Sequence, residues 1–449
     1  MEFPIKFKIN QRVLYTLFSA GIIILGSFAA IRFAQGYRIT SNGRLQNTGL
    51  LNANSFPSGA EVYIDNKLVS ATDNTLNLDP KEYDVLIQKE GYGPWEKKLR
   101  VENGLVTQTN AQLFRLVPGL TPLTFTGATN ISPSPDGQRL IFYTASASSK
   151  IRNGLYILDL SNSLLTTPKE AHQIAEESPG FDLNSASFTW SPDSTEVLMS
   201  TTGHDVLLDL TKQNVLSSLP DVGLQKKEMF SDWESQMYLR ERQFFAKFPD
   251  EIIKIATQSA KNVYLSPDKK KILYTATASA TIPGGLEPPL PASDNQPESR
   301  MIASGNTYVY DSEEDKNFLL SVTTQTPLVS DTFLATDLYR NQPLTLDASP
   351  SAFLRLQASS SAQTALNFAR FYSSLYTTGV QWFPDSKHVF FSDKDKIYIV
   401  EYDNTNKNAV YSGPFTDNFV YPWPDGSKLL ILTSFSTNSP ENLYAIELK

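Results

Sequence analysis

Five copies of a Pro-Asp turn motif constrain the fold of this chain more than any other feature of its sequence. Proline presets φ for the second position of a type I turn, and a Ser or Asp oxygen can accept hydrogen bonds from nearby amides. An apolar run begins five residues after every one of these prolines, so each motif is a corner from which a buried strand leaves. The prolines and acids of the five corners are Pro135 and Asp136, Pro192 and Asp193, Pro267 and Asp268, Pro384 and Asp385, and Pro424 and Asp425.

Each corner belongs to a longer unit of strand, corner, strand, loop and strand. The strand after the loop is again apolar, as in residues 155–160, 397–400 and 443–448. A unit this small cannot bury both faces of its sheet alone, and a radial array of sheets is the closed solution for β repeats of about 40 residues. The predicted fold class is therefore all-β, with residues 117–449 forming a β-propeller.

The number of blades follows less directly from the spacing of the corners. Successive corner prolines lie 57, 75, 117 and 40 residues apart, and only the last interval equals one blade. The interval of 117 residues is long enough for a further blade, for which Asn317 to Gln357 is the predicted segment. We expect six blades, within a range of five to seven, with the strand before Lys449 helping to close the ring.

Two segments interrupt the repeats. Residues 224–260 place aromatic and Met side chains at spacings near 3.6, which predicts helices that pack on the propeller rim or offer a docking surface. Residues 281–305 contain five prolines and few apolar residues, which predicts an extended, exposed loop.

The N-terminal region contains a run of nineteen uncharged residues, Val13 to Ile31. At about 1.5 Å per residue such a helix nearly spans a hydrocarbon core of roughly 30 Å, which predicts one transmembrane helix. Residues 1–12 are then a cytoplasmic leader and 32–47 a linker. Basic residues are balanced across the span, but a short basic leader favours an extracytoplasmic location for the rest of the chain. The alternative is a cleaved signal peptide and a secreted protein.

Residues 48–116 consist of short alternating runs separated by turns, which predicts a small β-sandwich-like module. The segments SFPSGAEVYIDNKLV and EYDVLIQKEGYGPWEKKLRV resemble the PEGA domain, a small β module of envelope and surface-layer proteins. The family's acidic residue is missing from the tetrad that names it. The matching residues are Pro57, Ser58, Gly59, Ala60, Gly91, Tyr92 and Trp95. The resemblance implies a spacer or adhesion module rather than an enzyme.

The repeats of residues 118–449 are similar to those of TolB-like and WD-repeat propellers. Residues 402–406, Tyr-Asp-Asn-Thr-Asn, resemble the outer turn of that repeat. The resemblance implies envelope machinery in which the partner is another envelope protein.

Several catalytic and binding chemistries lack their usual residues. The chain has no Cys, its three His are widely separated, and neither a G-x-S-x-G elbow nor a phosphate-binding Gly loop occurs. A net charge of −8 argues against a partner held by phosphate neutralisation. Asp311, Glu313 and Asp315 suggest calcium ligands, but the loop lacks the required Gly, and a solvated turn is expected.

A carboxylate pair of the glycosidase type leaves no motif and stays open as a route to catalysis. The corner acids are poor members of such a pair, because a catalytic pair has no reason to be copied five times.

The sequence thus predicts a membrane-anchored, extracytoplasmic binding or scaffolding protein of the cell envelope, without catalytic, cofactor-binding or metal-binding residues. Its expected partners are the membrane and an envelope protein, peptide or glycan, but no nucleic acid. The alternatives are a propeller enzyme acting on glycans or peptides, and a component of TolB-like envelope machinery.

Overall fold

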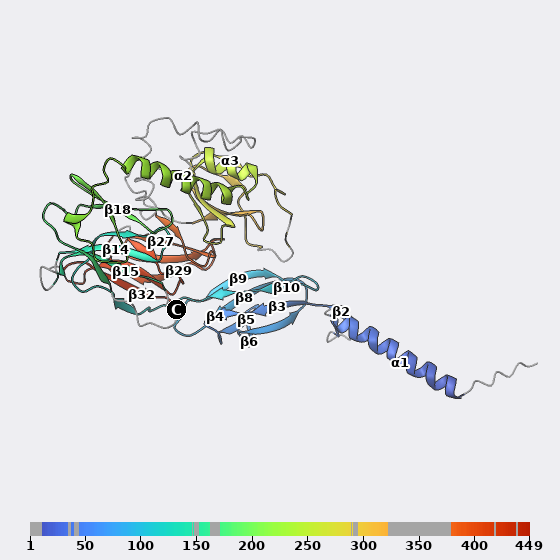
Figure 1. Ribbon diagram of the computed structural model, residues 1–449. Helices are drawn as coiled ribbons and strands as arrows, with labels where there is room; N and C mark the ends of the chain where they lie inside the picture. Colours follow the sequence, from blue (N-terminus) through green and yellow to red (C-terminus); the bar gives the residue numbers. More distant parts are fainter. Residues whose placement is uncertain are drawn as a thin grey trace, which may run out of the picture. The chain divides into compact units, whose positions relative to one another are not determined.

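The computed structural model describes residues 11–34, 37–39, 45–145, 147, 152–161, 171–288, 290, 295–321, 379–416, 419–436 and 439–449. The chain divides into two compact units (Figure 1). Unit 1 is Met1–Lys89, Pro94–Leu113 and Leu290–Asn295, and unit 2 is Glu90–Gly93, Phe114–Pro289 and Gln296–Lys449.

The predicted apolar helix is confirmed as α1, Gln11–Ala34. Its stretch Leu14–Arg32 is long and apolar enough to cross a membrane, and its large apolar side chains, such as Phe18 and Leu25, are exposed. A membrane anchor and a signal sequence both have this character. After the helix, β1 (Tyr37–Ile39) pairs antiparallel with β2 (Leu45–Asn47).

The rest of unit 1 is built from two main sheets. One has the strand order β10-β3-β7 and the other β6-β5-β8-β9, while β4 and β11 form a short parallel pair. The strands are β3 (Gly49–Ala53), β4 (Ser55–Phe56), β5 (Glu61–Ile64), β6 (Lys67–Ala71), β7 (Asn74–Leu78), β8 (Glu82–Gln88), β9 (Trp95–Arg100), β10 (Val106–Gln108) and β11 (Ala111–Gln112). Alternation explains the core: Tyr83, Val85 and Ile87 of β8 are buried, whereas Glu82 and Asp84, on either side of Tyr83, are exposed.

Unit 2 contains five sheets that each hold one predicted corner, which confirms the all-β prediction for this region. We number them in chain order. Sheet 1 is β13 (Thr129–Pro133), β14 (Arg139–Thr144), β15 (Gly154–Asp159) and β16 (His172–Glu176). Sheet 2 is β17 (Ser187–Trp190), β18 (Val197–Thr201) and β19 (His204–Leu208). Sheet 3 is β20 (Ala260–Leu265), β21 (Lys271–Ala276), β24 (Thr307–Asp311) and β25 (Lys316–Leu320).

Sheet 4 is β26 (Val380–Trp382), β27 (His388–Asp393), β28 (Lys396–Glu401) and β29 (Asn408–Ser412). Sheet 5 is β30 (Val420–Pro422), β31 (Lys428–Thr433), β32 (Asn442–Glu447) and β12 (Leu120–Pro122). In sheet 5 the first strand of unit 2 pairs antiparallel with the last, with Leu120 opposite Ile446. The two ends of unit 2 are therefore joined in one sheet.

Shared cores order the sheets as 2, 1, 5, 4 and 3. Strand β14 shows why its sequence is a continuous apolar run rather than an alternating one. Its Ile141 and Tyr143 pack toward sheet 2, while Leu140 and Phe142 pack toward sheet 5. A strand that is covered on both faces needs apolar residues at successive positions. Strands β27 and β31 are buried on both faces in the same way.

The predicted helical insertion consists of α2 (Lys226–Phe245) and α3 (Asp250–Gln258), preceded by the short 3₁₀ helix η2 (Leu216–Ser218). Phe230 and Trp233 of α2 pack on sheet 2, whereas Phe245 packs with α3 on sheet 3. In Figure 1 the two helices lie next to one another on one side of unit 2. The insertion thus connects sheets 2 and 3 through its own apolar side chains.

The predicted further blade lies mostly outside the described residues. Of the segment Asn317 to Gln357, the described residues begin inside β25, which is part of sheet 3. Sheets 3 and 4 share one core, in which Leu273 and Val309 lie with Val389. Six blades stay a prediction.

Part of the proline-rich segment is held in place, contrary to the prediction of an extended, exposed loop. Strands β22 (Ala280–Thr281) and β23 (Met301–Ile302) pair, and Ile282 and Ile302 are buried. The buried Asp315 carboxylate accepts hydrogen bonds from the amides of Gly285 and Leu286, at 2.9 and 3.0 Å, and pairs with Arg300 at 3.3 Å. A buried carboxylate that needs several donors therefore fixes the loop.

Candidate functional site

Each corner connects the first two strands of its sheet at the same end of the strands. We call this side of unit 2 the corner face. Neighbouring corners touch there: the Asp136 amide donates to the Ser194 hydroxyl at 3.1 Å, and the Asp268 amide to the Ser386 hydroxyl at 2.9 Å. The second strand of each sheet starts at its corner and runs to the opposite side of the unit. The opposite ends of the strands, where residues 177–186, 202–203, 434–436 and 439–441 lie between strands, form the loop face.

The predicted corner residues share one geometry. In each corner the Asp Oδ1 accepts a hydrogen bond from the amide two residues later, over distances of 2.8 to 3.1 Å. The amide after Asp also bonds to the carbonyl before Pro, as expected of a type I turn. The fourth residue of each corner has positive φ, although only two of these five residues are glycine. These residues are Gly137, Ser194, Lys269, Ser386 and Gly426, with φ from 60° to 72°.

Two of the three non-glycine residues at this left-handed position bond to another corner. The Ser194 and Ser386 hydroxyls accept the amides of the neighbouring corners. At Gly426 a side chain has no room, because an added Cβ would lie 2.9 Å from the Phe383 ring. The five corner acids thus hold their own turns, while Ser194 and Ser386 join the first corner to the second and the third to the fourth.

Phe383 and Trp423 stand at the start of the fourth and fifth corners, where the other three corners have Ser. The fourth corner also contains a buried His. Here Asp385 Oδ2 pairs with Nδ1 of His388 at 2.7 Å, and the His388 side chain is only 3% exposed. Burial opposes ionisation of Asp385, but His388 and two backbone amides outweigh it and lower the pKa of Asp385 to about 2. His388 is a structural partner of this turn.

The PEGA-like residues form turns and core contacts. Pro57 to Ala60 connect β4 to β5, with Gly59 at φ 71° and Ala60 fully buried. The Ser58 carbonyl accepts from Lys89 Nζ at 2.5 Å. Trp95 is 2% exposed and lies opposite Ile87 in the β8–β9 pair.

Gly91 and Tyr92 belong to unit 2 rather than to the sandwich sheets. Gly91 has φ 82°, and its carbonyl accepts from the Leu116 amide at 3.0 Å. Tyr92 forms an antiparallel bridge with Arg115. Both residues thus serve the backbone of the segment that enters the repeats.

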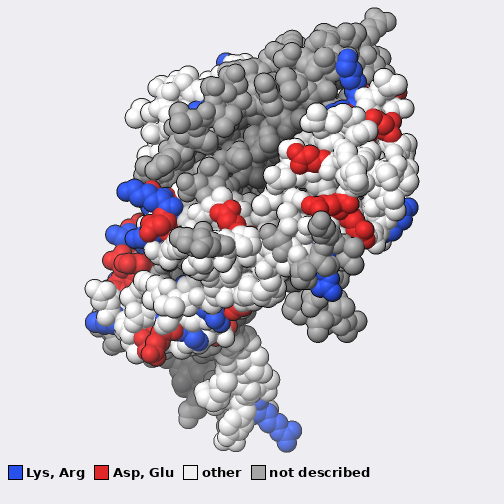
Figure 2. Space-filling view, turned by 90° about the vertical axis from the view of Figure 1, so that its left-hand side faces the viewer, with Lys and Arg blue, Asp and Glu red and all other residues white. Residues whose placement is uncertain are grey.

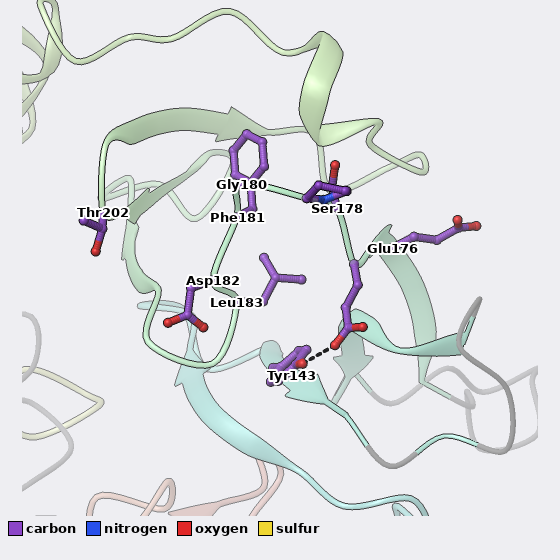
Figure 3. Close-up of a pocket in the computed structure, with 10 residues that line it drawn as sticks. Tyr143, Glu176, Ser178, Gly180, Phe181, Asp182, Leu183 and Thr202 are labelled. Carbon is purple, nitrogen blue, oxygen red and sulfur yellow. Dashed lines mark hydrogen bonds between the residues drawn. The ribbon is translucent and has the colours of Figure 1, made fainter.

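A cavity of about 820 Å³ opens on the loop face between sheets 1 and 2 (Figure 3). Its lining comprises Tyr143 of β14, Glu176 of β16, residues 177–183 of the next connection, and Thr202 after β18. Gly180, at φ 88°, allows this connection to turn. The cavity therefore lies between the strand ends of sheet 1, the connection that follows β16 and the turn after β18.

The chemistry of the cavity centres on a Tyr–Glu pair. The Tyr143 hydroxyl donates a short hydrogen bond to Glu177 Oε1. Burial and the Glu177 carboxylate raise the pKa of Tyr143 to about 12, so the phenol stays protonated. Glu177 itself is exposed, and the dashed line at Tyr143 in Figure 3 marks this hydrogen bond.

The other two carboxylates of the lining have local partners. Asp182 accepts from the amides of Asn184 and Ser185 and from the Ser185 hydroxyl at 2.5 Å, which lowers the pKa of Asp182. Glu176 accepts from Gln213 at 2.9 Å and points away from Tyr143 in Figure 3. Glu177 is thus the carboxylate best placed to meet a ligand.

An aromatic wall completes the cavity. The Phe181 ring stacks on His204 with centroids 4.9 Å apart, and His204 Nδ1 lies 3.8 Å from Asp221 Oδ2. Leu183 is buried and points into the space between Phe181 and Tyr143 (Figure 3). The site combines acceptor groups with flat apolar surface.

Sequence reasoning missed this cavity because its residues follow no motif. They come from two strand ends, one connection and one hairpin tip, and only folding brings them together. The one local signal is Ser178-Pro179-Gly180-Phe181, a turn that displays an aromatic residue.

The suspected calcium ligands do not form a site, but the solvated turn expected in their place is not found either. Asp311 and Asp315 are 2% and 4% exposed. Asp311 pairs with the buried Lys271 at 3.5 Å, and Glu313 with Lys270 at 2.7 Å. Across the described part of the chain, no group of three or more His, Asp or Glu side chains is arranged to hold a metal ion.

Residues 48–116 match the family model of the PEGA domain, which confirms the resemblance seen in the sequence. No curated protein matches the chain. Together with α1, the PEGA match indicates an envelope-associated protein.

Solved structures with similarity to the chain include two TolB proteins. A protein from Agrobacterium tumefaciens assigned as TolB is 12% identical, with 70% of this chain and 76% of that chain covered and a TM-score of 0.20. TolB from Acinetobacter baumannii is 11% identical, with coverages of 87% and 65% and a TM-score of 0.21. Hydrazine synthase from Kuenenia stuttgartiensis is 11% identical, with coverages of 91% and 98% and a TM-score of 0.18. At such TM-scores the fold of this chain rests on its own strand pairing.

Proposed function

We propose that this protein is a membrane-anchored, extracytoplasmic binding protein of the cell envelope. In this proposal α1 is retained as the anchor, the PEGA-like module serves as a spacer, and the loop face of unit 2 binds an envelope protein or peptide. The observation that carries the binding role is the cavity of about 820 Å³ between sheets 1 and 2. Connections displayed by a rigid sheet scaffold are where binding residues concentrate.

A non-catalytic role is part of the proposal. Glycosidic hydrolysis needs one carboxyl to act as an acid and a second to act as a base or nucleophile. In the cavity the Asp182 carboxylate is taken up by its own turn, and Glu176 is directed away from the Tyr143–Glu177 pair. The arrangement favours holding a ligand over cleaving one.

Location is tested by labelling single cysteines in intact cells. The natural chain has no Cys, so Lys387→Cys on the corner face provides a unique and exposed thiol. A membrane-impermeant maleimide is expected to label this variant in intact cells, after permeabilisation of any outer barrier, and the labelled chain is expected to sediment with membranes. Labelling only after lysis of the inner membrane would overturn the location, and labelled chain in the soluble fraction would indicate cleavage of α1.

Partner binding is tested by affinity purification of the tagged full chain from solubilised native membranes after chemical crosslinking. We expect a specific envelope protein to be enriched with the natural chain and lost with Thr202→Arg, which places a charge at an exposed position of the cavity lining. The matched control, Lys387→Arg on the corner face, should retain the partner. Equal recovery from both variants would exclude the cavity as the binding site, and enrichment of no protein would overturn the proposal.

A further inference from the structure

We propose that the cavity between sheets 1 and 2 recognises a basic side chain, with arginine fitting best, presented by a segment of the protein partner. This inference rests on the proposed binding function and adds the chemical class of the ligand. Its carriers are the shape of the cavity, the sign of its charged groups and the flat apolar wall beside them.

The charged groups of the lining all have one sign. Glu176, Glu177 and Asp182 contribute carboxylates, and among the described residues no Lys or Arg lines the cavity. The nearby Lys226 is engaged elsewhere, because its Nζ lies 2.7 Å from Asp205 and 2.8 Å from the Ser200 hydroxyl. A cavity with only negative charges attracts a cation and disfavours an anionic ligand.

Hydrogen-bonding capacity points the same way. The Tyr143 hydroxyl already donates its proton to Glu177, so this phenol offers a ligand no further proton. Glu177 lines the cavity together with Ser178 and Thr202. A carboxylate that accepts one hydrogen bond has capacity for more, and a hydroxyl oxygen can also accept. A guanidinium group supplies five N–H donors and no acceptor, which complements such a lining.

The apolar wall suits a planar cation. The Phe181 ring is held in position by stacking on His204, and Leu183 packs beneath it. A guanidinium can lie flat on an aromatic ring while its edge bonds to a carboxylate. The volume of about 820 Å³ leaves space for the backbone of the segment that carries the side chain.

The described surface seen in Figure 2 carries charges of both signs. On that face Lys and Arg side chains are interspersed with Asp and Glu. The preference for a cation is therefore argued from the lining of the cavity.

The test measures binding of a blocked Gly-Arg-Gly peptide to the full chain in detergent by ligand-observed NMR. The control peptide contains citrulline, which keeps the shape of arginine but has no charge. We expect the arginine peptide to bind and the citrulline peptide to bind about tenfold more weakly, because the charge-assisted hydrogen bond is lost. Equal binding of the two peptides, or no arginine binding up to about 5 mM, would overturn the inference.

Variants place the binding in the cavity. Glu177→Gln, at an exposed position, is expected to weaken arginine binding about tenfold, as is Thr202→Arg, which supplies a competing cation from the chain itself. The matched control is Glu313→Gln, an exposed acid near the corner face that pairs with Lys270. Unchanged binding in Glu177→Gln and Thr202→Arg, or an equal loss in Glu313→Gln, would contradict the assignment.

A glycan is the competing ligand, and a neutral tetrasaccharide of N-acetylglucosamine serves as its probe. If the natural chain binds the tetrasaccharide and Thr202→Arg does not, the ligand of the cavity is a sugar and not a basic side chain. The two proposals fail separately. If a partner is captured through the cavity but the arginine peptide does not bind, only the ligand class is wrong. If no partner is enriched, the binding function itself fails.

Discussion

The corner face and the loop face of unit 2 are built from the same strands but follow different rules. On the corner face, five turns repeat one hydrogen-bond pattern, and two pairs of neighbouring turns bond to each other. On the loop face, the connections vary in length and sequence, and one pair of sheets leaves a cavity open. Repetition therefore marks the face that maintains the fold, and irregularity marks the face for which we propose a binding role.

The largest expected effect on stability belongs to Trp190, at the end of β17 next to the second corner. Its side chain is fully buried, and Nε1 donates to the Ser132 hydroxyl of sheet 1 at 3.1 Å. Trp190→Ala should lower the free energy of unfolding by about 3–5 kcal/mol, measured by denaturant titration with circular dichroism. Phe181→Ala on the loop face is the control and should cost about 1 kcal/mol. Similar losses in both variants would erase the distinction between the two faces.

The second effect is a pH dependence at the fourth corner. The pKa of Asp385 is about 2 in the folded chain, below the value of about 3.9 expected when unfolded. Stability from this group is therefore fully present above about pH 4 and is lost as the pH falls through 2. Compared with Asp385→Asn, the natural chain should lose roughly 2 kcal/mol more between pH 4 and pH 2. Parallel pH profiles for the two proteins would refute a stabilising role for the Asp385–His388 pair.

The third effect concerns the fourth position of the corners. Lys269 has φ 62°, a region that costs a residue with a Cβ about 1 kcal/mol. Lys269→Gly should raise the free energy of unfolding, measured by urea titration, by about 0.5 kcal/mol. This value is what is left after the extra chain entropy of glycine in the unfolded state is subtracted. Gly426→Ala provides the opposite case and should destabilise, because its Cβ would meet the Phe383 ring. A stabilising Gly426→Ala would show that the corners tolerate either residue.

The smallest expected effect is at Thr202 on the loop face. Thr202→Ala removes one hydroxyl from the cavity lining and should change the free energy of unfolding by less than about 0.5 kcal/mol. Thermal unfolding of the two proteins side by side would measure the difference. A loss above about 1 kcal/mol would mean that the cavity edge is part of the scaffold.

The sequence was sufficient for features that repeat or that extend over many residues. The corners could be recognised because proline, aspartate and the following apolar run recur at a fixed distance. Helix α1 could be recognised because it contains nineteen consecutive uncharged residues. The match of residues 48–116 to the PEGA domain confirms the interpretation of that module.

Features that depend on tertiary contacts could not be predicted. Asp315 was expected in a solvated turn, yet it is buried because Arg300 and two amides from a distant loop bind it. The positive φ of Ser194 and Ser386 could not be predicted either. The hydrogen bond that offsets its cost is made to an amide of another sheet. The cavity combines Tyr143 with Thr202, residues that no local pattern connects.

Site-specific photocrosslinking in living cells tests the binding role of the loop face most directly. A photoreactive amino acid is placed at Thr202 on the loop face or, as the matched control, at Lys387 on the corner face. The expected result is one discrete crosslinked partner from position 202, reduced in the Glu177→Gln background, and none from position 387. A partner captured from position 387 but not from position 202 would contradict the assignment of binding to the loop face.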